Sequence, residues 1–280
     1  MNAHTPIQKA PAEPLALPRL PRRWGKAMHH FRKLIADKED TAQVFHITNS
    51  LNGDDLYKSY NEFIATPQGQ ARFAEYRTLP PILDDRDRLF AMPEGSLAHA
   101  YIDFMDSQGL TAQGLVDEFD SFARQADGVD TRPPHFKWYN NRLRDTHDML
   151  HVLTGYSRDA LGETCVLAYS YQQTRGLGIQ FIAYMGALEV RRWAPKGAPV
   201  IGSIREAARR GKLAKGIEYY DLLDLLPRPL EEVRDMLGVT PMVKYPKVHA
   251  MMEAAGIDPY EAISGPVAST AAALNKPTAA

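Results

Sequence analysis

Two histidines and two carboxylates near the middle of the sequence have the chemistry of metal ligands. At 100° per residue, Arg144, His147, Asp148 and His151 fall within a sector of about 100° on one helical face. Two imidazoles and a carboxylate can therefore converge on one point. Glu163 follows His151 by twelve positions and supplies a second carboxylate from the next helix.

A short break separates the two helices that carry these side chains. Gly155 supplies the end of the first helix, and Ser157 is expected to be the N-cap of the second. On that second helix, Val166 and Leu167 lie one turn after Glu163, so the carboxylate faces an apolar seam. An unpaired charge is costly there, and a facing cation would remove that cost.

The pair His147 and His151 has two interpretations. Taken alone, it is equally compatible with a solvated helix face on which Asp148 pairs with Arg144. Asp148 and the apolar setting of Glu163 favour a metal site with four ligands, His147, Asp148, His151 and Glu163. Mixed histidine and carboxylate ligands suit one divalent ion, zinc or iron(II), and the sequence does not choose between them.

Composition limits the class of protein. A chain of 280 residues with 44% hydrophobic residues can bury a full core in one or two domains. A formal net charge of −1 gives no general attraction to nucleic acid, so no nucleic-acid partner is expected. The single cysteine, Cys165, excludes a disulfide framework and fits a reducing compartment, and we expect it in the core.

The hydrophobic pattern predicts an all-α fold. Apolar residues recur at helical spacing, and no alternation typical of strands was found. Leu79-Pro80-Pro81 predicts an extended connection. Helices are expected over residues 24–37, 41–51, 55–65, 66–77, 97–105, 112–124, 133–154, from the break after Gly155 to 174, 176–190, 203–215 and 227–238.

Both ends of the chain differ from the rest. Residues 1–23 form a proline-rich basic tail without the apolar run of a signal peptide, which predicts a disordered segment and a cytoplasmic protein. Residues 263–280 are small and polar without any period, which predicts a second disordered tail. A single multi-helix domain is therefore expected over residues 24–262, with the metal site between two consecutive central helices.

Two segments are candidates for contact with a membrane surface. Residues 176–190 are the most apolar stretch, but they are too short to span a bilayer, so they form a core helix or a helix lying in an interface. Arg191-Arg192-Trp193 follows directly. The basic residues between Arg19 and Lys26 would contact anionic lipid, or else form a solvated arm.

Several motifs occur in an order that resembles a known family. They are Leu89-Phe-Ala-Met-Pro-Glu-Gly-Ser-Leu-Ala, Arg142 and Arg144 ahead of His147-Asp148-x-x-His151, Gly155, Leu161-Gly-Glu163, the Gly-rich helix that follows, and Pro229-Leu-Glu-Glu-Val-Arg. With eleven residues between the His-Asp-x-x-His motif and Glu163, the sequence resembles the ubiquinone biosynthesis proteins of the fourth coenzyme Q family, Coq four.

The resemblance implies a function for a bacterial member of that family. It implies an all-helical protein that binds one divalent metal through His147, Asp148, His151 and Glu163. The family acts on polyprenylated quinone precursors, replacing the head-group carboxylate with a hydroxyl, and organises the other ubiquinone enzymes. The start of the chain does not resemble a mitochondrial import sequence, so we expect peripheral attachment to the cytoplasmic face of the inner membrane. A homodimer is also expected.

This activity would need three kinds of residue. The metal would keep an open position for the phenol oxygen or for dioxygen, with Asp148 as a catalytic group. Arg144 or Arg142 would hold the substrate carboxylate, although a salt bridge from Arg144 to Asp148 is an equal alternative. The isoprenoid tail would need an apolar channel, for which the neighbouring helices offer Val166, Leu167, Ile179, Phe181 and Ile182, residues that core packing explains equally well.

Three other classes fit parts of the pattern. A non-catalytic lipid-binding scaffold with a structural metal is the main alternative. A His-Asp metal phosphohydrolase would need a further histidine and aspartate, which only His99 or His135 and Asp221 or Asp224 offer. A zinc peptidase needs Glu directly after the first histidine, where this chain has Asp148.

Overall fold

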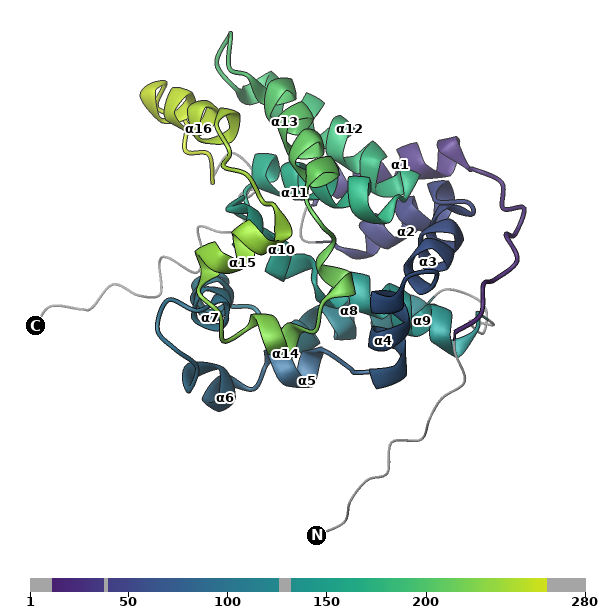
Figure 1. Ribbon diagram of the computed structural model, residues 1–280. Coiled ribbons are helices and arrows are strands. Elements are labelled where there is room, and N and C mark those ends of the chain that lie inside the picture. Colours follow the sequence, from purple (N-terminus) through teal and green to yellow (C-terminus); the bar gives the residue numbers. More distant parts are fainter. Residues whose placement is uncertain (1–11, 38–39, 126–131, 261–280) are drawn as a thin grey trace, which may run out of the picture.

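The protein is built from helices in a computed structural model that describes residues 12–37, 40–125 and 132–260 (Figure 1). No strand occurs among these residues, which confirms the predicted all-α fold. The α-helices are α1 (Trp24–Ala36), α2 (Ala42–Leu51), α3 (Asp55–Ile64), α4 (Pro67–Glu75), α5 (Pro80–Leu83), α6 (Arg86–Phe90), α7 (Leu97–Gln108), α8 (Ala112–Gln125), α9 (Pro134–Asp145), α10 (His147–Thr154), α11 (Ala160–Thr174), α12 (Leu177–Trp193), α13 (Val200–Leu213), α14 (Leu222–Leu225), α15 (Leu230–Leu237) and α16 (Lys244–Ala254).

Helix α11 is the centre of the packing. It packs against both α12 and α13, and α12 in turn packs against α1 and α2 (Figure 1). The largest apolar core joins α11 to α7, α10, α15 and α16. Cys165 is buried in this core, as its sequence context predicted. Glu163 is therefore carried by a helix that packs against several others.

A close backbone approach fixes α11 against α13. A Cβ atom at Gly211 of α13 would lie 2.2 Å from the carbonyl oxygen of Tyr169 of α11, so only glycine fits at this crossing. Tyr169 is itself buried. The position of α11, and of the Glu163 carboxylate that it carries, thus depends on a glycine at position 211 of α13.

The predicted helix over residues 133–154 is two helices. The helix is interrupted at Thr146, whose φ and ψ are −96° and 2°. The Thr146 hydroxyl donates to the carbonyl oxygens of Arg142 at 2.9 Å and Leu143 at 3.2 Å. A threonine hydroxyl that bonds back to the preceding turn bends a helix. His147 consequently begins the new helix α10.

The Pro80-Pro81 segment also differs from the expectation. It forms the first turn of α5, because proline fits the first helical positions, where no backbone N–H donor is needed. The predicted extended connection is therefore wrong. Helix α16 was not predicted from the sequence at all.

Part of the proline-rich N-terminal segment lies along the folded domain. The Leu15 N–H donates to Asn61 at 2.8 Å, and Arg22 forms an ion pair with Asp55 at 3.0 Å. Residues 12–23 thus contact α3 and α4. The remainder of the tail predicted over residues 1–23 and the one predicted over residues 263–280 lie outside the described residues.

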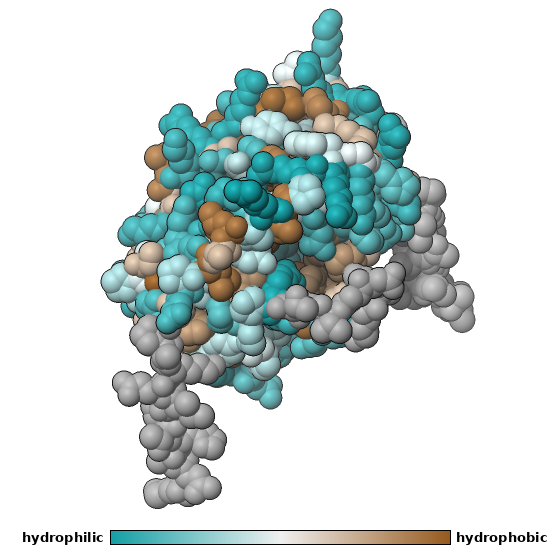
Figure 2. Space-filling view, turned by 90° about the vertical axis from the view of Figure 1, so that its right-hand side faces the viewer, coloured by the Kyte–Doolittle hydropathy of each residue, from teal (hydrophilic) through white to brown (hydrophobic). Residues whose placement is uncertain are grey.

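No membrane-spanning helix is found in the part of the chain that the structure describes. None of its helices combines the length and the apolar character needed to cross a bilayer. Figure 2 shows one face of the molecule, on which small apolar patches alternate with hydrophilic side chains.

The packing of α11 predicts opposite effects of two glycine substitutions. Gly211→Ala should destabilise the protein by about 3 kcal/mol, because its Cβ meets a backbone carbonyl. Gly25→Ala on α1 is the matched control; a Cβ there meets nothing within 4 Å, so the change should stabilise by about 0.5–1 kcal/mol. Urea unfolding measures both, and wild-type stability for Gly211→Ala would contradict the packing.

Candidate metal centre

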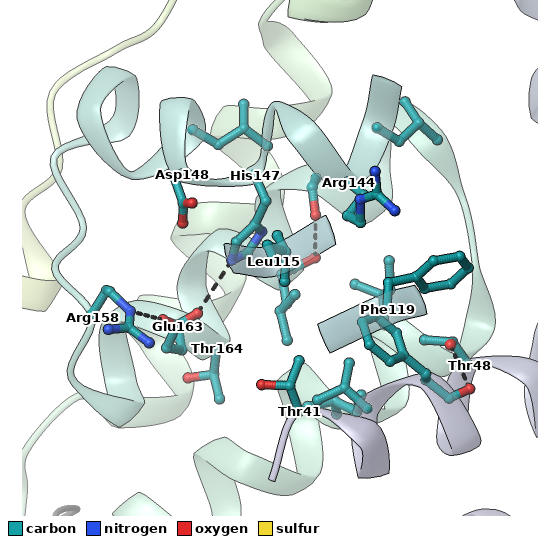
Figure 3. A pocket seen from close by; sticks show the side chains of 18 of the residues that line it. Thr41, Thr48, Leu115, Phe119, Arg144, His147, Asp148, Arg158, Glu163 and Thr164 are labelled. Carbon is teal, nitrogen blue, oxygen red and sulfur yellow. Dashed lines mark hydrogen bonds and ion pairs between the residues drawn. The ribbon is translucent and has the colours of Figure 1, made fainter. Parts of the chain in front are cut away.

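Three of the predicted ligands meet at the junction of α10 and α11. Histidine Nε2 atoms of His147 and His151 and a carboxylate oxygen of Glu163 all lie within 4.8 Å of one another. Glu163 Oε2 lies 3.5 Å from His147 Nε2 and 3.4 Å from His151 Nε2, and the two Nε2 atoms are 3.4 Å apart. Figure 3 shows His147 and Glu163 pointing toward each other from the two helices.

The chain reverses between these helices in a tight turn. Gly155 ends α10 with φ 78°, a left-handed conformation that glycine adopts without strain, and its N–H donates to the His151 carbonyl at 2.8 Å. The N-cap of α11 is Asp159, whose carboxylate accepts from the N–H groups of Leu161 and Gly162 at 3.1 Å. The expectation that Ser157 caps this helix is therefore wrong.

His151 is held in one orientation by that turn. Its Nδ1 lies 2.9 Å from the carbonyl oxygen of Tyr156, and its ring stacks on Phe104 at 5.4 Å between centroids. A neutral imidazole in this position donates from Nδ1–H and leaves the Nε2 lone pair facing Glu163. Backbone carbonyls hold metal-binding histidines in the same way.

Two arginines satisfy the carbonyl groups at the end of α10. Arg234 of α15 donates to the Val152 carbonyl at 2.8 Å and to the Leu153 carbonyl at 2.9 Å. Arg210 of α13 donates to the Thr154 carbonyl at 3.0 Å. These carbonyls have no partner within the helix, and the positive charges of the arginines also interact favourably with the negative end of the helix dipole.

The charges of the three ligands depend on one another. Burial alone would raise the pKa of Glu163, but the facing imidazoles of His151 and His147 outweigh it and lower that pKa well below its usual range. Burial disfavours a charged His151, yet the Glu163 carboxylate reverses this and raises the pKa of His151. The carboxylate is therefore ionised, and it favours the protonated form of His151.

Asp148 is not part of the group of three. Its side chain lies near His147 and lines the same cavity (Figure 3). Its charge contributes to the raised pKa of His151. Of the four predicted ligands, the structure thus brings His147, His151 and Glu163 together and leaves Asp148 beside them.

The two predicted substrate arginines have different surroundings. Arg144 lines the cavity, where it donates to Asp145 at 2.8 Å and lies over the Phe119 ring at 5.2 Å. Its acidic partner is thus Asp145, whereas we had considered Asp148. Arg142 is buried and donates to the carbonyl oxygens of Glu218 at 2.8 Å and Tyr220 at 2.5 Å, and it is absent from the described cavity lining.

A large cavity opens beside the ligand group. Its volume is about 780 Å³, and residues of α1, α2, α3, α8, α9, α10, α11, α12 and α16 contribute to its lining. Three of the residues proposed for a tail channel contribute to its wall: Leu167, Ile179 and Ile182. The other two, Val166 and Phe181, pack in the hydrophobic cores instead. Figure 3 shows Leu115 and Phe119 across the cavity from Glu163.

Sequence reasoning missed the residues that hold the turn. Arg158, between the two helices, lines the cavity and places its Nε 3.5 Å from Glu163 Oε1. Arg210 and Arg234 come from distant helices, so no local pattern marks them. Only Asp159 had a recognisable signal, because Asp is as good an N-cap as Ser and directly precedes the apolar run.

The donor set fits the predicted metal. Zinc and iron(II) both accept a donor set of two imidazole nitrogens and one carboxylate oxygen. The second ring nitrogen of His151 is held by a backbone carbonyl, as is common for metal-binding histidines. The residues required by a phosphohydrolase are elsewhere: His99 Nε2 lies 3.2 Å from the Phe90 carbonyl, and Asp221 pairs with Arg72 and Arg77. Within the described ranges, none of His99, His135, Asp221 and Asp224 belongs to the metal-capable group.

Known proteins resemble this chain over much of its length. It is 27% identical to the mitochondrial ubiquinone biosynthesis protein COQ4 homolog of Mus musculus over 171 residues, 58% of this chain and 56% of the mouse protein. It is 27% identical to the mitochondrial COQ4 protein of Yarrowia lipolytica over 128 residues, 44% of this chain and 45% of that protein. The chain thus spans about half the length of these relatives.

A solved structure and a family profile agree with these relatives. A crystal structure from Nostoc punctiforme, provisionally described as a ubiquinone biosynthesis protein, has a TM-score of 0.56 at 21% identity and covers 78% of this chain and 99% of its own, so the two share a fold. The profile of the coenzyme Q (ubiquinone) biosynthesis protein Coq4 matches residues 33–243, which include all three converging ligands. The chain belongs to the Coq4 family of coenzyme Q (ubiquinone) biosynthesis proteins.

Proposed function

We propose that this protein acts in ubiquinone biosynthesis as a metal-dependent enzyme. Its substrate is a polyprenylated hydroxybenzoate precursor, whose carboxylate it removes and replaces with a hydroxyl. The observation that carries the proposal is the convergence of His147, His151 and Glu163 at the wall of a large cavity in a Coq4 family member. When bound, zinc or iron(II) would supply Lewis-acid or redox chemistry at that wall.

The reaction needs an oxidant as well as a metal. Replacing the carboxylate with a hydroxyl releases carbon dioxide and takes up an oxygen atom. If dioxygen is the source, its other oxygen atom leaves as water after reduction by an external electron donor. The cavity beside the ligands offers space for the aromatic head group and for a small oxidant next to it.

The cavity wall along α11 suits an isoprenoid tail. The hydroxyl groups of three polar residues on this wall donate hydrogen bonds to backbone carbonyls of α11 itself. Thr164 donates to the Ala160 carbonyl, Ser170 to the Leu167 carbonyl and Thr174 to the Ser170 carbonyl. A hydroxyl already bonded to the backbone needs no partner in the cavity. The surface that such residues turn toward a ligand is therefore effectively apolar.

Arg144 is the proposed contact for the substrate carboxylate. Its guanidinium has five N–H donors, and the bonds to Asp145 use only part of them. Arg158 is a second cation at the same wall, next to Glu163. Arg142 was predicted for the same role, but its bonds to two carbonyls away from the cavity support a structural role.

Asp148 is proposed to act on the substrate from beside the ligands. As the neighbour of His147 at the cavity wall, it would accept a proton from a bound phenol, or become a fourth ligand after a side-chain rotation. The alternative function is a non-catalytic lipid-binding scaffold with a structural metal. That alternative is favoured by the separation of Asp148 from the group of three.

Attachment to the cytoplasmic face of the inner membrane is proposed through α12. Its exposed residues include Leu188 at 44% and Trp193 at 65% exposure, next to Arg191 and Arg192. Trp24, 53% exposed, packs edge-on against Phe181 and so joins the basic N-terminal segment to this helix. A homodimer and contacts with other ubiquinone enzymes remain predictions.

The metal site predicts that the purified protein binds about one zinc or iron(II) ion per chain. His147→Ala should lose this metal, whereas His99→Ala, outside the ligand group, should retain it. Elemental analysis measures both, and equal metal content in all three proteins would refute the site.

Metal affinity should also fall as the pH drops through the raised pKa of His151, because protons then compete for the imidazole.

The catalytic proposal predicts that Asp148→Asn stops conversion of the carboxylated polyprenyl phenol while the protein stays folded and membrane-bound. The amide keeps the shape of the side chain but removes its charge. Asp87→Asn, an exposed change on α6, is the matched control. Cells carrying Asp148→Asn should accumulate the precursor. Normal ubiquinone at a normal protein level would show that Asp148 is not catalytic.

The membrane proposal predicts binding to vesicles that contain anionic lipid at low salt. The double substitution Leu188→Asp with Trp193→Ser should reduce flotation several-fold. It removes apolar area from the surface and adds a negative charge, which the anionic lipid repels. Phe90→Ser is the control, since Phe90 is 55% exposed but lies on α6, at the opposite end of the molecule from α12 (Figure 1). Equal flotation of all variants would contradict this assignment.

A further inference from the structure

Helix α16 holds the end of α11 that carries Glu163. The Tyr245 hydroxyl donates a short hydrogen bond to Asp159 Oδ2, and His249 Nε2 lies 3.1 Å from Asp159 Oδ1. The same Tyr245 hydroxyl accepts from the Ser157 N–H at 3.3 Å. Asp159, Tyr245 and His249 are all buried. One carboxylate thus binds two N–H groups of its own helix and two side chains of α16.

This carboxylate sets the first turn of α11. Asp159 caps the helix, and its carbonyl oxygen accepts the Glu163 N–H at 2.8 Å. A Cβ atom at Gly162 would lie 1.9 Å from the Ser157 carbonyl oxygen, so the turn is also packed tightly against the preceding loop. A shift of Asp159 would therefore move Glu163 relative to His151, whose ring the Tyr156 carbonyl holds.

Helix α16 lies outside the residues that match the family profile. The match ends at residue 243, and α16 begins at Lys244. Met252 of the same helix lines the cavity, so α16 borders both the ligand helix and the ligand space. The family profile therefore does not explain why this helix contacts Asp159.

We propose that Tyr245 and His249 are positioning residues, which act through Asp159 to fix Glu163 opposite the two histidines. The inference rests on the proposed metal function. Metal-binding side chains must be held within about 0.5 Å of their working geometry, and residues behind the ligands supply that restraint. Substituting such residues in other metal sites weakens metal binding by about 10–100-fold.

Hydrogen exchange of the metal-free protein tests the structural half of the inference. Tyr245→Phe and His249→Gln should speed exchange of the Leu161, Gly162 and Glu163 amides, since the acceptor at Asp159 is no longer fixed. Val248→Ala, on the same helix but packed in the apolar core, should destabilise the protein without a selective effect on this turn. Unchanged protection of the three amides in both Asp159-contact variants would overturn the inference.

Cobalt(II) titration tests the link to the ligands. Tyr245→Phe should weaken Co²⁺ binding about tenfold and alter the visible absorption band that reports the coordination geometry. Val248→Ala should lower the melting temperature but keep the wild-type affinity and band. Wild-type affinity and spectrum in Tyr245→Phe would refute positioning, whatever its stability. Failure of the wild-type protein itself to bind Co²⁺ would instead refute the proposed function, and the amide exchange would still decide whether α16 restrains α11.

Discussion

The turn from Gly155 to Asp159 is the constraint on which the candidate site depends. It reverses the chain between α10 and α11, so that His151 before it and Glu163 after it face each other. Both helix ends meet there, with orphan carbonyls on one side and orphan N–H groups on the other. Arg210 and Arg234 satisfy the carbonyls, and Asp159 satisfies the N–H groups. Each charge also has the sign that the adjoining helix dipole favours.

Much of this site could be predicted because its rules are local. A histidine pair four apart needs only one helix to share a face, and α10 provides it. Gly155 marks the end of that helix because glycine adopts the left-handed conformation freely. The apolar residues around Glu163 correctly indicated an enclosed helix. These arguments required no knowledge of which distant segments would pack nearby.

The rest depended on tertiary contacts that spacing does not encode. Arg142 and Arg144 look alike in sequence, yet one binds carbonyls of the 218–220 segment and the other lines the cavity. The Thr146 hydroxyl bonds back to the preceding turn, and the helix is interrupted there. Threonine makes the same bond inside continuous helices, so the residue type alone does not predict the break. Helix α16 has too weak an apolar period to be recognised, and its contact with Asp159 joins residues about ninety positions apart.

The charges of the ligand group are coupled. The two facing imidazoles lower the pKa of Glu163, and the Glu163 carboxylate raises the pKa of His151, even though burial opposes both charges. A divalent ion bound here would compete with protons for the imidazoles and would face an ionised carboxylate. Because His151 is held by the Tyr156 carbonyl and Glu163 by the capped turn, binding of a metal would require little movement of the chain. Little of the metal-binding free energy would then be used to order the ligands.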